Sequence, residues 1–125
     1  MTPFEEQFDA LQKELSGASY LKIPDGSFVV TVPGLRLPDG WTAPVTTVYF
    51  IAPVGYPVSR PDCFWSDADL KLTGGRVPQN TGANPLPNGP APLLWFSWHV
   101  SNWSPNADTL LTYVNVIKKR FQELK

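Results

Sequence analysis

The spacing of the hydrophobic residues changes twice along this chain, and no other feature restricts the fold as strongly. Apolar residues recur at helical spacing near the start and again near the end, while the segments between them alternate with a period of two. Helical ends around a strand-rich middle are typical of an α+β domain. A chain of 125 residues is long enough for one core. We therefore predict a single α+β domain spanning residues 1–125.

Two helices are predicted. The first begins at Thr2, because Thr2, Pro3 and Glu5 stand in the order of a capping box with proline in the first turn. The second is predicted to begin at Ser104-Pro105, again a cap followed by proline, and its basic residues 118–120 suit the C-terminal end of a helix dipole. The predicted apolar faces consist of Phe4, Phe8, Leu11 and Leu15 in the first helix and of Leu110, Val114, Ile117, Phe121 and Leu124 in the second.

Four strands with tight turns predict an antiparallel meander. They are Tyr20–Ile23, Phe28–Val32, Val45–Ala52 and Cys63–Ser66. Residues 73–94 differ in composition, with four Gly, five Pro and three Asn, and this excludes both helix and sheet there. Because long loops inside small domains are commonly functional, the segment is either the rim of a functional site or a variable connector.

Composition excludes several classes of function. The net charge is −1, charged residues make up 17% and no basic face is evident, so neither nucleic acid nor an anionic membrane is an expected partner. No apolar run approaches the roughly 20 residues of a membrane span. The acidic start has no signal-like apolar region, and the single Cys63 cannot form an internal disulfide, so we expect a cytoplasmic protein. One His, one Cys and no phosphate loop predict neither a metal site nor a cofactor.

The segment from Trp95 to Trp103 holds three of the five tryptophans and the only histidine. In an extended segment Ser97 and His99 share one face, and a histidine within hydrogen-bond reach can activate a serine hydroxyl. These two are the candidate catalytic pair, unless His99 is a structural residue bonded to the backbone. Cys63 lies in a short apolar strand, which is typical of an inert thiol. It is the secondary candidate for a nucleophile.

The order of motifs resembles the ubiquitin-conjugating enzyme superfamily. A Tyr-Pro turn at 56–61 is followed by the aromatic strand Phe64-Trp65, a long loop and Trp103-Ser104-Pro105 before a helix. The Pro-Asp-x-Phe-Trp run at 61–65 and the Ser-x-His at 97–99 are similar to its prokaryotic family E. The resemblance implies a helix, a four-strand meander, an active-site loop and a second helix. It also implies, as partners, a ubiquitin-like protein, an activating-type enzyme and a JAB-type peptidase from the same operon.

This chain departs from the superfamily pattern at the reactive position. The transfer cysteine lies eight residues before the Trp-Ser-Pro tryptophan, where this chain has Trp95, and only Val77 to Asn80 echoes the expected His-Pro-Asn motif. One hypothesis is a bacterial transferase that carries the modifier on Ser97 with help from His99. A second is a non-catalytic variant that binds the ubiquitin-like protein or its activating enzyme. A third is an aromatic-lined module for peptide or glycan. The expected binding surface consists of Trp95, Trp98, Trp103 and Asn80.

Overall fold

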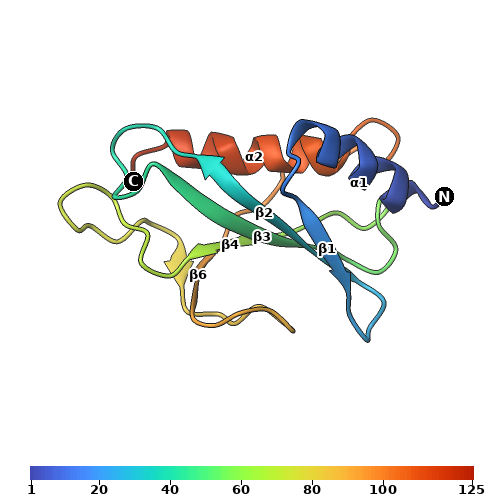
Figure 1. The fold of residues 1–125 in the computed structure, drawn as a ribbon, viewed down its shortest axis with the longest axis horizontal. Helices are drawn as coiled ribbons and strands as arrows, with labels where there is room; N and C mark the ends of the chain where they lie inside the picture. Colours follow the sequence, from blue (N-terminus) through green and yellow to red (C-terminus); the bar gives the residue numbers. More distant parts are fainter.

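The computed structural model describes all residues from 1 to 125, and two helices cover one face of a six-stranded antiparallel sheet (Figure 1). The sheet order is β1-β2-β3-β4-β6-β5. The elements are α1 (Pro3–Glu14), β1 (Ser19–Lys22), β2 (Phe28–Arg36), β3 (Val45–Ala52), β4 (Phe64–Asp67), β5 (Thr81–Gly82), β6 (Leu93–Phe96) and α2 (Leu110–Gln122). The α+β class is confirmed, and the sheet is larger than the predicted four strands.

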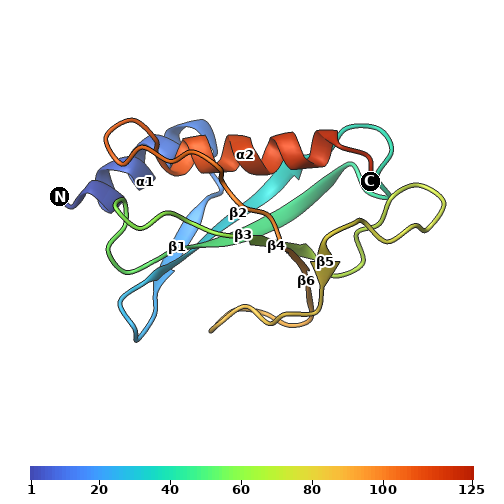
Figure 2. The same ribbon diagram turned by 180° about the vertical axis from the view of Figure 1, so that it is seen from behind.

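The two additional strands, β5 and β6, fall in or beside the segment that was predicted to contain no sheet. Leu93–Phe96 pairs with β4, so that Phe64 stands opposite Phe96, and Thr81–Gly82 pairs with β6 at the edge of the sheet (Figure 2). The prediction of a simple loop over 73–94 was wrong because proline and glycine are concentrated between these strands. That composition concealed the apolar run at the end of the segment.

The start of α2 also differs from the prediction. Residues 105–107 form a turn instead of a helix, and the carboxylate of Asp108 accepts a 2.7 Å hydrogen bond from the backbone N–H of Ser104. The helix begins at Leu110, and Thr109 is its N-cap in a capping box with Thr112. The first helix begins as predicted, because Thr2 and Glu5 exchange both bonds of a capping box.

The core lies between the helices and the sheet. The predicted apolar faces are buried except at their C-terminal ends, where Leu15 is half-buried and Leu124 is 46% exposed because it lies beyond α2. A smaller apolar cluster lies on the other face of the sheet and consists of Ile23, Val29, Trp65 and Leu86. Leu86 belongs to the segment that joins β5 to β6 and runs along that face, away from the helices (Figures 1 and 2). This segment therefore closes the second cluster.

The two sequence motifs that bracket the predicted loop are in contact. The indole N–H of Trp103 donates a 2.8 Å hydrogen bond to the carbonyl of Pro57, and its ring lies 6.0 Å from that of Tyr56. Tyr56 in turn donates to the side chain of Gln7 in α1, and Gln7 accepts from the backbone of Leu110 at the start of α2. These bonds join both helices to the Tyr-Pro turn. Neither helix has the length and apolar content that a membrane crossing requires.

Candidate functional site

The pairing of β4 with β6 brings the candidate reactive residues together. Beyond the last paired residues, Phe64 and Phe96, the backbone N–H of Cys63 donates a 2.9 Å hydrogen bond to the carbonyl of Trp98. In an antiparallel pair, residues before one strand lie beside residues after the other. The segment that enters β4 therefore lies beside His99, which is distant in sequence.

His99 is paired with Asp62, a residue that the sequence did not indicate. Its Nδ1 lies 2.6 Å from Oδ1 of Asp62, and the two side chains are 66% and 59% exposed. Since a carboxylate accepts hydrogen bonds, Nδ1 carries the N–H and neutral His99 keeps its lone pair on Nε2. Asp62 therefore fixes the ring in the tautomer that a general base needs.

Cys63 is the third member of this cluster. Its sulfur and the donor atoms of Asp62 and His99 all lie within 4.8 Å of one another. The residue is only 8% exposed, and its φ of 62° is in the left-handed region, which non-glycine residues adopt at a cost of about 1–2 kcal/mol. Strain of this kind is concentrated at functional sites. The backbone of Cys63 is held on one side by Trp98 and on the other by the Tyr113 hydroxyl, which donates to its carbonyl.

The surroundings of Cys63 favour the protonated form of its thiol. Burial raises the pKa of Cys63, and the negative charge of Asp62 raises it further. Hydrogen bonds from the backbone of Trp98 and from the side chain of Trp95 act in the opposite direction without reversing the shift. A nucleophilic role for Cys63 therefore requires a base, and the only imidazole in the chain lies next to it.

Ser97 is the other predicted member of the catalytic pair. Both residues, with Asn80 and Trp98, line a hollow of about 280 Å³. The backbone N–H of Ser97 donates a 2.7 Å hydrogen bond to the carbonyl of Asn80, whose φ of 61° is also left-handed. The predicted pair thus shares a hollow, but the hydrogen bond of His99 is to Asp62 instead of Ser97.

The three tryptophans of the predicted binding surface do not lie on one surface. Trp95 packs against the small cluster on the far face of the sheet, whereas Trp98 and Trp103 pack against the main core. Trp98 stacks 5.3 Å from the guanidinium of Arg120. Of the four predicted residues, only Trp98 and Asn80 border the hollow at His99.

Arg120, in α2, contacts the segment that leads to the hollow at His99. The sequence did not indicate this role, because Arg120 stands in a basic run. It is 1% exposed, and its guanidinium donates to the backbone carbonyls of Gln79, Glu123 and Lys125. Burial lowers its pKa, and its Nε has no hydrogen-bond partner. Arg120 therefore ties the segment before Asn80 to the C-terminal end of the chain.

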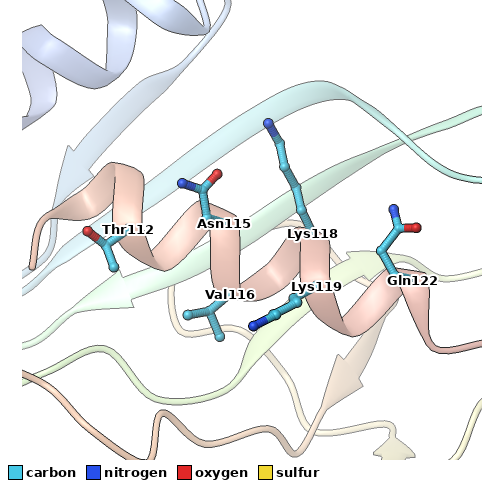
Figure 3. Close-up of a pocket in the computed structure, with 6 residues that line it drawn as sticks. All are labelled: Thr112, Asn115, Val116, Lys118, Lys119 and Gln122. Carbon is cyan, nitrogen blue, oxygen red and sulfur yellow. The ribbon is translucent and has the colours of Figure 1, made fainter.

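The surface beside His99 continues onto the outer side of α2. A second hollow of about 380 Å³ is lined by Trp98, His99, Val116 and Lys119, among others. Val116 and Lys119 also belong to the open outer face of α2, together with Thr112, Asn115, Lys118 and Gln122 (Figure 3). Their shared residues make the second hollow continuous with this face. The result is an open surface that ends at His99.

One of the comparisons with known proteins identifies the family of this chain. No curated protein and no solved structure matches the chain. The family model for prokaryotic E2 family E matches residues 7–124, which is nearly the whole chain and includes the Tyr-Pro turn, the His99 cluster and α2. This chain therefore belongs to prokaryotic E2 family E.

Proposed function

We propose that this protein carries a ubiquitin-like modifier on Cys63, with His99 as the general base and Asp62 as the residue that orients His99. The observation that carries the proposal is the cluster in which the Cys63 sulfur, the His99 ring and the Asp62 carboxylate lie within 4.8 Å of one another. A nucleophile, a base and a group that orients the base are the minimum for acyl transfer.

The proposed step transfers the modifier's acyl group from one thiol to another. His99 takes the proton of the Cys63 thiol while the sulfur attacks the modifier's C-terminal carbonyl, which arrives as a thioester on an activating-type enzyme. The new S–C bond forms, the old one breaks, and the leaving thiolate takes the proton from His99. Because burial and Asp62 raise the pKa of Cys63, the base is required near neutral pH.

The surface beside His99 favours a docked partner. The second hollow, of about 380 Å³, meets the outer face of α2 at Val116 and Lys119. Lys118 and Lys119 are exposed on that face and would attract acidic groups of a docked protein. We expect the modifier and its activating-type enzyme as partners, with a JAB-type peptidase from the same operon, in the cytoplasm.

Ser97 is the second candidate for the carrier residue. It lines one hollow with His99 and is held in place by the carbonyl of Asn80. A modifier on Ser97 would be linked through an oxyester, which resists mild thiol and breaks in strong base. A modifier on Cys63 would be linked through a thioester, which mild thiol removes. The two carriers are therefore distinguishable by chemistry alone.

The test is reconstitution with the cognate activating-type enzyme, the ubiquitin-like protein and Mg-ATP, followed by intact mass measurement. We expect a thiol-sensitive adduct that Cys63→Ala abolishes and that His99→Gln slows by about 100-fold or more. Ser97→Ala is the matched variant at the second candidate carrier, which lines a hollow with His99. An adduct lost in Ser97→Ala and kept in Cys63→Ala would assign the carrier role to Ser97. No adduct with any variant or with the natural chain would leave the non-catalytic binding role, which the same components test by direct affinity measurement.

A further inference from the structure

Three side chains that bind transition metals meet at the end of β4. The thiol of Cys63, the imidazole of His99 and the carboxylate of Asp62 each offer one donor atom, and these atoms all lie within 4.8 Å of one another. Zn²⁺ binds sulfur at about 2.3 Å and nitrogen or oxygen at about 2.0–2.2 Å, so its tetrahedral ligands stand about 3.3–3.8 Å apart. Small side-chain rotations would bring the three donors to that spacing.

The positions of the three residues are compatible with their donor atoms moving to the spacing of zinc ligands. The backbone of Cys63 is held by hydrogen bonds to the carbonyl of Trp98 and from the hydroxyl of Tyr113, so its side chain starts from a fixed point. The side chains of Asp62 and His99 are more than half exposed, so no core packing opposes their adjustment around an ion. Their separation of 2.6 Å is shorter than the ligand spacing, so an ion would enter between them and replace their hydrogen bond. The fourth position would face solvent, as in zinc sites with three protein ligands.

The charges of the cluster also favour a divalent cation. A thiolate and a carboxylate together carry two negative charges, and their donor atoms lie within 4.8 Å of each other. A bound Zn²⁺ would compensate both charges, and the thiol proton would leave to solvent as the S–Zn bond forms. A thiolate combined with an imidazole favours Zn²⁺ over the hard cations Mg²⁺ and Ca²⁺.

We propose that Asp62, Cys63 and His99 form a Zn²⁺ site, and that bound Zn²⁺ withholds the Cys63 thiolate from acylation. The first part stands on the donor cluster alone, whereas the second rests on the proposed carrier function. A metal-bound sulfur has its lone pair engaged and cannot attack a carbonyl. The cluster would then exist in a metal-bound state and in a state open to the modifier.

Cobalt absorption spectroscopy on the full, reduced chain tests the site without any modifier present. Co²⁺ in a tetrahedral site with a thiolate ligand gives a sulfur-to-cobalt charge-transfer band in the near ultraviolet and intense visible bands. We expect both at one ion per chain, and we expect added Zn²⁺ to remove them. A chain that shows no such bands, and no Zn²⁺ binding by calorimetry, overturns the site.

Variants identify the ligands. Cys63→Ser should abolish the charge-transfer band. Loss of a residue that only supports a ligand weakens metal binding by about 10- to 100-fold. His99→Gln or Asp62→Asn should weaken Zn²⁺ binding by more than this, because each removes a ligand. Asp69→Asn is the matched control, since Asp69 is an exposed carboxylate outside the cluster. If Cys63→Ser does not fold, the two exposed positions still decide the outcome. Binding that is equal in all four variants would be adventitious and would overturn the site.

Modifier loading tests the second part, measured at saturating Mg²⁺ with a Zn²⁺-selective chelator and with added Zn²⁺. We expect Zn²⁺ to slow loading and chelator to restore it. Equal loading under both conditions overturns the withholding role. A cobalt spectrum that depends on Cys63 in a chain that never loads would support the metal site and count against the carrier function. The two proposals therefore fail separately.

Discussion

The hydroxyl of Tyr113 donates a 2.6 Å hydrogen bond to the main-chain carbonyl of Cys63. Tyr113 is completely buried in α2, and burial raises its pKa far above the ordinary range, so the hydroxyl remains a donor where an ordinary tyrosine would have ionised. The bond holds Cys63 in its left-handed conformation from inside the core. A core residue thus fixes the backbone of the candidate carrier.

Tyr113→Phe should lower the free energy of unfolding by about 1–3 kcal/mol, because the carbonyl of Cys63 would be left without its buried donor. Urea denaturation measures this change. Tyr49→Phe is the control, since the hydroxyl of Tyr49 makes no hydrogen bond in the structure, and it should alter stability by less than about 0.5 kcal/mol. Equal effects of the two substitutions would show that the bond to Cys63 contributes little.

The rate at which an alkylating reagent modifies Cys63 should rise with pH, and this rise should occur at a higher pH than for an ordinary cysteine. Burial, followed by the charge of Asp62, raises the pKa of the thiol, so the folded chain holds this proton where an ordinary cysteine, with a pKa of about 8.5, has lost it. Alkylation near pH 8 should therefore be slower in the folded chain than in urea. Asp62→Asn should move the profile to lower pH. A profile at the ordinary cysteine pKa, unchanged by Asp62→Asn, would contradict the shift.

The same shift makes stability depend on pH. Since the folded state has the higher pKa, it binds more protons than the unfolded chain through the alkaline range. The contribution of Cys63 is therefore fully present below the unfolded pKa and is lost as pH rises toward the folded pKa. Comparing the chain with Cys63→Ala from pH 7 to pH 10 should show the natural chain losing more stability.

Arg120 should be intolerant of substitution although it stands in a basic run with Lys118 and Lys119. Arg120→Met removes the three donors that its guanidinium gives to backbone carbonyls, and it should lower the free energy of unfolding by about 1–3 kcal/mol. Arg120→Lys should not restore this stability, because an ammonium group lacks the planar fork. Lys119→Met, at the adjacent exposed position, is the control and should change stability by less than about 0.5 kcal/mol. Thermal unfolding of the three variants decides the outcome.

The start of α2 shows how local signals can mislead. Ser104-Pro105 and Thr109 are both acceptable starts, and the sequence contains no local reason to prefer the later one. The backbone N–H of Ser104 is bonded to Asp108, and the neighbouring Trp103 is tied to Pro57 in a distant turn. These contacts hold the segment in a turn. The Ser104–Asp108 bond is local, whereas the bond from Trp103 to Pro57 joins residues 46 apart in sequence and forms only in the folded chain. The apolar stripe of the helix was therefore predictable, but its first residue was not.

The candidate site was predictable only in part for a similar reason. His99 and Ser97 were indicated by their types and spacing, and the structure places both at one hollow. Asp62 and Cys63 reach His99 only through the pairing of β4 with β6. That pairing involves a four-residue strand directly after a proline-rich segment. The apolar run Leu93–Phe96 was the available signal, and composition averaged over residues 73–94 concealed it.

Asn80 offers a test that separates backbone from side-chain function. Its φ of 61° is accessible to glycine without cost, and its carbonyl accepts the bond from Ser97 in either case. Asn80→Gly should therefore leave the melting temperature nearly unchanged. Asn80→Val places a branched side chain in the left-handed region and should lower stability by about 1–2 kcal/mol.

The loading rate of Asn80→Gly then reports on the amide alone. Asn80 lines the hollow that also contains Ser97 and His99. The prediction is that its side-chain N–H groups stabilise the negative charge that develops on the modifier's carbonyl oxygen during transfer. If they do, loading should fall by about 100-fold or more in a protein that is folded normally, which is the usual effect of losing such a donor. The measurement is the initial rate of adduct formation in the reconstituted system, with the melting temperature recorded on the same sample. An unchanged rate would limit Asn80 to its conformational role in the turn.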